Sequence, residues 1–183
     1  MSDKPVNYDL LSPTNFLARS VEVFPDKTAV IYMDTSHTWT QFQERVFRLA
    51  NALKARGIGP GDKVAFICPN TPPMLEAHYA VPLIGAALVS INIRLSAGEL
   101  AYIINHSDAK AVFADNEFGP VIASVVSELT AVEFYVNICD IDDSTPLNGP
   151  DYEAFLADSP TDPVHLAIRD ERGISSRIGW SGR

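Results

Sequence analysis

Apolar residues in this chain gather into short continuous runs that recur every 23 or 24 residues. The clearest are Lys63–Cys68 (KVAFIC) and Ala86–Ile91 (AALVSI). Continuous runs of this length are typical of parallel strands that are covered on both faces. Each interval leaves room for one crossover helix. We therefore predict an α/β fold built on a parallel βα-repeat sheet with flanking helices, and strands that start near Lys63, Ala86, Lys110 and Glu133.

Capping residues and apolar periodicity predict a helix between each pair of runs. Thr71 is placed to cap the first helix, with Pro72 at its first position, where a missing N–H has no cost. Pro82 lies within that helix, so we expect the helix to kink or end early. Ser96 and Glu99 form an S-x-x-E capping box for the next helix. The predicted helices are Pro72–Ile84, Ser96–His106 and about Gly119–Leu129.

The chain before the first run is predicted to begin with a helix and a hairpin. Ser12 and the proline that follows it open a helix that runs to about Val23. Two short apolar or β-branched segments, Thr28–Met33 and His37–Thr40, flank a turn and predict a small β-hairpin.

A second amphipathic helix follows the hairpin. Thr40 and Gln43 form a T-x-x-Q capping box at its start. Glu44 and Arg48 lie four residues apart on its polar face and are expected to pair. Gly57 is expected to end it.

Composition narrows the class of protein. The 183 residues form one or at most two domains with 46% hydrophobic and 20% charged residues, as in ordinary globular proteins. The formal net charge of −9 argues against nucleic-acid binding. No apolar run reaches the ~18 residues of a membrane span, and the N-terminus lacks a signal-peptide layout. Cys68 and Cys139 fall in predicted buried strands, so we expect reduced thiols and a cytoplasmic protein.

Three glycines, Gly57, Gly59 and Gly61, resemble a phosphate-binding loop at first sight. Such a loop must follow a strand and open a helix, so that free amide groups point at the phosphate. Here the glycines end a helix and lead into a strand, and a tight turn is the better interpretation.

The loops after the predicted strands are poor phosphate sites. The segment 69–73 contains three prolines and offers few amide donors. Asp115, Glu117 and the acidic stretch 140–143 would repel a nucleotide, and that stretch lacks calcium-loop spacing. Arg94, beside a predicted helix N-terminus, is the one credible anion site, with an ordinary surface arginine as the alternative.

The histidines show no metal-ligand spacing; they are His37, His78, His106 and His165. His78 shares a helix face with Leu75, and we expect it to pack there. No nucleophile elbow of the G-x-S-x-G type occurs. From the residues alone we assign no catalytic, cofactor-binding or metal-binding residue.

The order of segments nonetheless resembles the N-terminal part of the AMP-forming acyl-CoA synthetases, the acyl-adenylate-forming superfamily. The matching pieces are FPDKTAV, TWTQFQERV, GIGPGDKVAFICPN and LIGAALVSINIRLSAGELAYI. MLEAHYAVP, DNEFGPVI and DYEAFLA look closest to the branch that acts on short- or medium-chain carboxylic acids. The resemblance covers roughly residues 8–165.

The resemblance implies a two-step ligase. A carboxylic (fatty) acid attacks the α-phosphate of ATP to give acyl-AMP and pyrophosphate, and CoA then displaces AMP. It also implies Mg²⁺ and a glycine- and threonine-rich phosphate loop. That loop is expected near Ile174, where the chain instead reads GISSRIGWSGR. No family residue is therefore carried over, and we expect the 183-residue chain to bind none of these cofactors tightly and to be inactive alone.

The pattern of the chain changes near its C-terminus. We predict two parts: residues 1–165, the N-terminal portion of an AMP-binding domain, and residues 166–183, an aberrant disordered tail with no regular element after Val164. Four arginines crowd into the last fifteen residues, and we interpret Arg172–Arg183 as a product of altered reading, such as a frameshift, a retained intron or a misplaced gene boundary. Sequencing the transcript beyond codon 183 tests this prediction.

Two other functions stay open. The domain could be a non-catalytic interaction module that binds a partner through the face of a truncated domain. It could also be an unrelated doubly wound nucleotide-binding domain, although that would require a phosphate-accepting loop after a strand.

Overall fold

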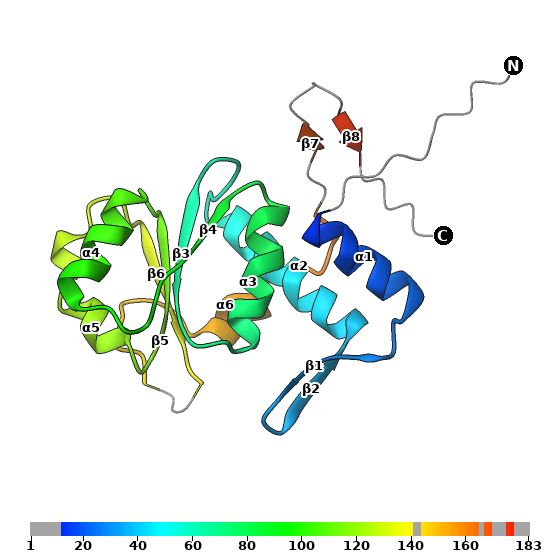
Figure 1. The fold of residues 1–183 in the computed structure, drawn as a ribbon, viewed down its shortest axis with the longest axis horizontal. Coiled ribbons are helices and arrows are strands. Elements are labelled where there is room, and N and C mark those ends of the chain that lie inside the picture. The colour runs from blue at the N-terminus through cyan, green and yellow to red at the C-terminus, as the bar shows by residue number, and fades with distance from the viewer. Residues whose placement is uncertain (1–11, 141–143, 165–166, 170–174, 178–183) are drawn as a thin grey trace, which may run out of the picture.

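A computed structural model describes residues 12–140, 144–164, 167–169 and 175–177. Its main body is a four-stranded sheet with helices on both faces (Figure 1). The strands lie in the order β4-β3-β5-β6 and every neighbouring pair is parallel. Their bounds are β3 Lys63–Ile67, β4 Ala87–Ser90, β5 Ala111–Asp115 and β6 Phe134–Ile138. The predicted α/β fold is confirmed, and each strand begins within one residue of its predicted start.

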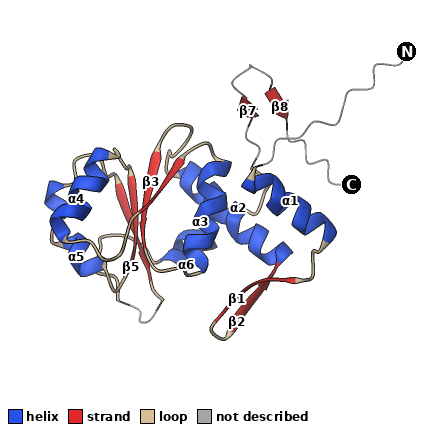
Figure 2. Ribbon diagram, viewed as in Figure 1, coloured by secondary structure: helices blue, strands red, loops and turns tan. Residues whose placement is uncertain are grey.

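The apolar runs form strands because both faces of the sheet are covered. One core contains side chains from α2, α3 and α6, and the other contains side chains from α4 and α5 (Figure 2). At the centre, the rings of Phe66 and Phe113 stack with centroids 4.4 Å apart. The helices are α1 Pro13–Val23, α2 Trp39–Ala55, α3 Pro72–Leu83, α4 Ala97–His106, α5 Gly119–Ala123 and α6 Tyr152–Ala157.

The N-terminal helix and the hairpin are confirmed, with shifted bounds. Ser12 Oγ accepts the N–H of Asn15 and caps α1. Strands β1 (Thr28–Tyr32) and β2 (Thr35–Thr38) pair antiparallel in a sheet of their own. In Figure 1 this hairpin lies below the end of α2 and is separate from the four-stranded sheet, although Tyr32 at the end of β1 reaches Asp140 just after β6.

The predicted capping box of α2 is wrong by two residues. Thr38 and Gln41 form it, with the Gln41 N–H 3.2 Å from Thr38 Oγ1 and Gln41 Oε1 accepting the Thr38 N–H at 2.9 Å. Thr40 instead donates its hydroxyl to the carbonyl of Pro25. The sequence contains two overlapping T-x-x-Q patterns, and the first is used because β2 ends at Thr38.

The expected Glu44–Arg48 pair is also replaced. Arg48 donates to the carbonyls of Ala157, the last residue of α6, and of Ser159, just beyond it, at 3.1 and 2.9 Å. The guanidinium thus fixes two helices to one another, because α6 packs against α2.

Two helix ends differ from expectation. The segment predicted as one helix from Gly119 to Leu129 breaks after Ala123 and resumes as a 3₁₀ turn, η1 (Val126–Glu128). Ser124 donates its hydroxyl back to the carbonyl of Val121, which competes with continuation of the helix. The S-x-x-E box of α4 is formed as predicted.

Helix α3 ends one residue after Pro82, so the proline lies in the last turn. Thr71 occupies the N-cap position of α3 as predicted, but its side chain makes no capping hydrogen bond. Its hydroxyl points to the carbonyl of Pro69 at 3.5 Å.

Past Val164 the described residues include an element that the sequence did not predict. Strands β7 (Ala167–Arg169) and β8 (Ser175–Arg177) pair antiparallel. The rest of 165–183, with His165 and the position expected for a phosphate loop near Ile174, lies outside the described residues. The boundary at residue 165 stays a prediction.

Candidate functional site

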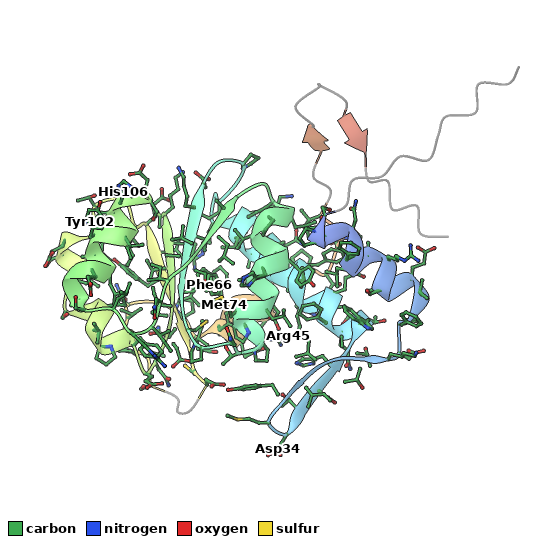
Figure 3. All side chains as sticks on the ribbon, in the orientation of Figure 1. Asp34, Arg45, Phe66, Met74, Tyr102 and His106 are labelled. Atoms are coloured by element: carbon green, nitrogen blue, oxygen red, sulfur yellow. The ribbon has the colours of Figure 1, made fainter. Side chains whose placement is uncertain are left out.

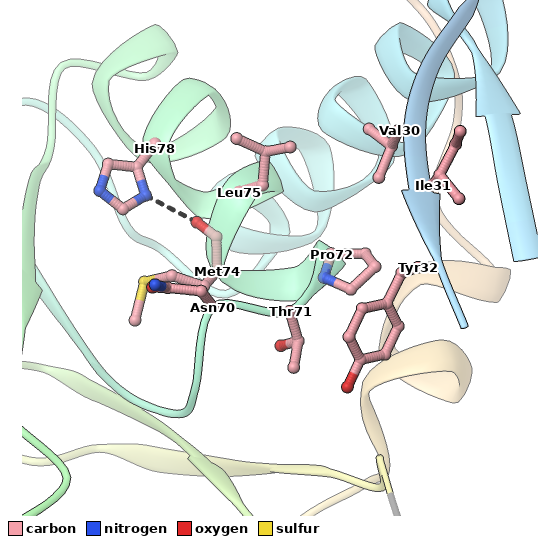
Figure 4. A pocket seen from close by; sticks show the side chains of 9 residues that line it. All are labelled: Val30, Ile31, Tyr32, Asn70, Thr71, Pro72, Met74, Leu75 and His78. Carbon is pink, nitrogen blue, oxygen red and sulfur yellow. Dashed lines mark hydrogen bonds between the residues drawn. The ribbon is translucent and has the colours of Figure 1, made fainter.

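The carboxyl ends of the parallel strands are where open α/β sheets bind ligands. In this chain the hairpin β1–β2 and the start of α3 flank that edge, after strand β3. A hollow of about 280 Å³ lies between them (Figure 4). Its lining residues are Val30, Ile31, Tyr32, Asn70, Thr71, Pro72, Met74, Leu75 and His78.

The lining of this hollow is mainly apolar, with polar side chains at its rim. Asn70 and His78 are exposed, and His78 Nδ1 lies 2.7 Å from the carbonyl oxygen of Met74. The expectation that His78 packs beside Leu75 is therefore wrong, since both side chains are exposed. An imidazole at the rim of an apolar hollow can orient a ligand. The two hydroxyl side chains of the lining, Tyr32 and Thr71, are directed to Asp140 and to the carbonyl of Pro69 and not to His78, so the lining presents no assembled catalytic pair.

A second hollow of about 410 Å³ adjoins the first and has a different character. Tyr32 and Pro72 line both hollows. The second is bordered by the carboxylates of Asp140, Asp151 and Glu153. The Tyr32 hydroxyl donates to Asp140 Oδ2 at 2.7 Å, and this hydrogen bond raises the pKa of Tyr32 to about 12.

Beside the second hollow lies a cluster of polar side chains that the sequence analysis missed. Glu76 on α3 is fully buried, and its carboxylate accepts from Arg45 Nε at 2.5 Å and from the Tyr152 hydroxyl at 2.5 Å. Arg45 on α2 also pairs with Glu153 on α6. The cluster therefore joins three helices that are far apart in the sequence.

Burial and ion pairing shift the pKa values of the charged groups in this cluster in opposite directions. Burial raises the pKa of Glu76, while the Arg45 guanidinium and the Tyr152 hydroxyl lower it, with burial the larger effect. Burial opposes the charge of Arg45, but hydrogen bonds to Glu153 and Glu76 raise its pKa. His37 lies near Arg45, and its pKa is lowered by burial first and then by that guanidinium. A buried carboxylate needs such partners, because an unpaired charge in the interior is very costly.

The glycine segment behaves as a turn, as predicted. Gly57 and Gly61 adopt φ of 84° and 87°, values that favour glycine, between the end of α2 and the start of β3.

For Arg94, the start of α4 favours the alternative of an ordinary surface arginine. It is exposed, and the Glu99 carboxylate already accepts the N–H and the hydroxyl of Ser96 there. A second anion at this helix end would meet that negative charge.

The cysteines differ from each other. Cys68 is buried just after β3, and burial raises the pKa of its thiol to about 12. Cys139 follows β6 and is half-buried, so the expectation that both cysteines lie inside buried strands is wrong. Neither forms a disulfide.

The described residues at the carboxyl edge of the sheet do not fit a nucleoside triphosphate. Asp115 is buried at the end of β5 and Asp140 follows β6, so the local charge is negative. Arg45 lines the second hollow, but it already pairs with two carboxylates. Within the described ranges no group of three or more His, Cys, Asp or Glu side chains could hold a metal ion. In that same part of the chain, no helix is long and apolar enough to cross a membrane.

The parallel sheet and the residues at its carboxyl edge together define an open α/β domain with two adjoining hollows at that edge. The family described as "AMP-binding enzyme" matches residues 17–168. The chain belongs to this family, as the sequence resemblance predicted.

Proteins similar to this chain include several CoA ligases. The chain is 46% identical over 114 residues to the peroxisomal acetate/butyrate–CoA ligase AAE7 of Arabidopsis thaliana, covering 62% of this chain and 20% of that one. It is 44% identical over 124 residues to 4-hydroxybutyrate–CoA ligase 2 of Metallosphaera sedula, covering 68% and 23%. Among solved structures, the anthranilate CoA ligase AuaEII in complex with anthranoyl-AMP superposes with a TM-score of 0.77 at 25% identity, covering 89% and 31%.

The chain thus spans between a fifth and a third of the length of these proteins. The name of the Arabidopsis relative includes a peroxisomal location, so a cytoplasmic location for this chain stays a prediction.

Proposed function

We propose that residues 12–164 form the N-terminal framework of an ATP-dependent acid–CoA ligase that activates a short- or medium-chain carboxylic acid. The observation that carries this proposal is the family match over residues 17–168, joined to a fold shared with a CoA ligase. The small-acid substrate class is supported by the relatives' names, acetate/butyrate and 4-hydroxybutyrate ligases.

Such a ligase forms acyl-AMP with release of pyrophosphate, and CoA then displaces AMP. Negative charge develops on the phosphates in the first step, so catalysis needs cations or backbone donors aimed at them. The described edge of this sheet is acidic. We infer that ATP, Mg²⁺ and CoA are bound by parts of the enzyme outside the described residues, and that the chain alone is inactive. This chain contributes the sheet on which those parts assemble.

A chimera tests the proposal. Residues 12–164 replace the matching segment of the Arabidopsis acetate/butyrate–CoA ligase, and acyl-CoA formation is measured with ATP and acetate or butyrate. We expect activity that depends on ATP and on the acid. A folded chimera that is inert with small acids would contradict the proposal.

The 183-residue chain alone is the second arm of the same assay. We expect no pyrophosphate release with ATP and any small acid. Turnover by this chain would show that a phosphate-binding group exists within it and that our account of the acidic edge is wrong.

We infer further that the framework ends near residue 165 and that 166–183 is a separate tail. Limited proteolysis followed by mass spectrometry is expected to cut the chain first after residue 165. Early cuts inside the sheet would contradict this division.

An interaction module remains the second candidate, because a specific observation favours it. Ile31 and Met33 on the hairpin expose 76% and 72% of their surface, next to the apolar hollow.

A further inference from the structure

The segment that follows β6 passes around the edge of the sheet and joins its two cores. Leu147 is buried in the core beside α4 and α5, and Tyr152 is buried in the core beside α2 and α3. In Figure 3 the label of Tyr102 marks the first of these faces, and that of Arg45 marks the second. Residues 147–150 therefore form a short loop at the outer edge of β6.

Asn137 on β6 holds this loop in place. Its side chain is fully buried, and its Nδ2 donates to the carbonyls of Leu147 and Gly149 at 3.1 and 3.0 Å. Its Oδ1 accepts the Leu147 N–H at 3.0 Å, and its backbone N–H donates to the carbonyl of Pro150 at 2.9 Å. We call these four hydrogen bonds the Asn137 clasp. Opening the loop would leave a buried amide without its partners, so the clasp favours the closed loop.

The loop presents an Asn–Gly pair to solvent. Asn148 is exposed, and it is the only asparagine among the 183 residues that is followed by glycine. Glycine has no side chain to shield its backbone nitrogen. That nitrogen can therefore approach the side-chain carbonyl carbon of the preceding asparagine, which is the first step of spontaneous deamidation.

Deamidation exchanges ammonia for water. The Gly149 nitrogen loses its proton and bonds to Cγ of Asn148, while the Cγ–Nδ2 bond breaks and ammonia leaves with that proton. The resulting five-membered succinimide takes up one water molecule, which opens either of its two carbonyl–nitrogen bonds. The products are aspartate and isoaspartate, whose main chain runs through the side-chain carbon. Each product carries one added negative charge.

The folded loop opposes the first step of this reaction. The Gly149 N–H donates to the Leu147 carbonyl at 2.9 Å, and φ at Asn148 is not positive, so the turn is an inverse γ-turn. In such a turn ψ of the central residue is about +65°. That angle turns the Gly149 nitrogen away from the Asn148 side chain, whereas ring closure needs both on the same side. Gly149 also packs directly on the Tyr135 carbonyl, so the peptide cannot rotate until the loop leaves β6.

We propose that the Asn148–Gly149 bond is a site of spontaneous deamidation, and that the Asn137 clasp slows the reaction by holding the loop closed. The reaction proceeds from the open loop, so its rate follows the population of the open form. Isoaspartate adds one carbon to the main chain where Gly149 packs on Tyr135, and this leaves no room for the modified loop to close as before.

Mass spectrometry of the 183-residue chain tests the site. The peptide that contains residue 148 is followed with time at pH 8, in buffer and in urea. We expect deamidation in urea, and a rate at least about tenfold slower in the folded chain. Asn148→Gln is the matched control. Its longer side chain would have to close a six-membered ring, so the signal should disappear under both conditions.

Weakening the clasp is expected to accelerate the reaction. Asn137→Ala removes the side-chain hydrogen bonds to the loop and should raise the rate in the folded chain at least about tenfold. Leu147→Ala, which leaves Asn137 in place, is a second variant and should change the rate in the same direction. Val64→Ala is the matched control, because Val64 lies on β3, which β5 separates from β6. It should leave the rate within about twofold, since the loop opens on its own.

Three results would overturn the proposal: no deamidation at residue 148 in urea, equal rates in the folded and unfolded chain, or equal acceleration by Val64→Ala and the two loop variants. The last would show that the whole chain must open and that the clasp does not control the reaction. None of these measurements involves acyl-CoA formation, so their outcome is independent of the proposed function.

Discussion

Glu76 shows where reasoning from single residues fails. It lies with Met74, Ala77 and Ala80 on the buried side of α3. That side could not be recognised in the sequence, because apolar residues occur nearly all round this helix. Its partners could not be predicted either, because Arg45 and Tyr152 are brought to it by the packing of other helices.

Loss of the buried carboxylate is expected to cost far more stability than loss of its exposed neighbour. Glu76→Ala leaves Arg45 and the Tyr152 hydroxyl without their buried acceptor and should lower the free energy of unfolding by about 3 kcal/mol. Glu153 is 64% exposed, so Glu153→Ala should cost less than about 1 kcal/mol. Urea unfolding of the two variants measures the difference, and equal costs would mean that the buried pair adds nothing.

The thiol of Cys68 is expected to resist alkylation across a wide pH range. Burial raises its pKa to about 12, and the reactive form is the thiolate. From pH 7 to 9 labelling of Cys68 by iodoacetamide should therefore stay slow in the folded chain. In urea its pKa returns to about 8.5, and the rate should rise steeply with pH. Mass spectrometry separates Cys68 from Cys139; fast labelling of folded Cys68 at pH 8 would contradict its burial.

At the scale of helices and strands, the sequence predicts which elements form more accurately than it predicts the residues at which they begin and end. Apolar periodicity located the strands within a residue because both sheet faces are buried. The sequence pattern predicts the capping box at Thr40, but the structure has it at Thr38, because local pattern alone cannot choose between overlapping motifs. At the early end of α5, Ser124 donates its hydroxyl to the carbonyl of Val121, a local bond of the kind that competes with a helix and that apolar periodicity does not reveal.

Replacement by alanine is expected to change stability in opposite directions at Gly149 and Gly98. At Gly149, beside β6, a Cβ would lie 1.9 Å from the carbonyl oxygen of Tyr135, so the backbone must move. Gly149→Ala should destabilise the chain by about 3 kcal/mol, as severe overpacking does. Gly98 lies in α4 with open space around it, and Gly98→Ala should stabilise by about 0.5–1 kcal/mol. Thermal unfolding compares them; a neutral Gly149→Ala would show that this segment is free to shift.

At the scale of the whole molecule, spacing predicted a parallel sheet but not the order of its strands. The order β4-β3-β5-β6 places β3 and β5 at the centre and β4 at an edge. Nothing in the lengths of the connections specifies this order. It nevertheless decides the chemistry of the carboxyl edge, since it brings the segments after β3 and β6 to the same region as the hairpin.

The strand order implies that the central strands β3 and β5 are locally more stable than the hairpin β1–β2. Strands β3 and β5 are buried and paired on both sides, so their amides can exchange with solvent through global unfolding alone. The hairpin is a two-stranded sheet with one face exposed, and such a ribbon is marginally stable by itself. Hydrogen exchange followed by mass spectrometry should therefore find the hairpin exchanging at least about a hundredfold faster than β3. Protection of the hairpin equal to that of β3 would contradict the exposure of its outer face, where Ile31 is 76% exposed.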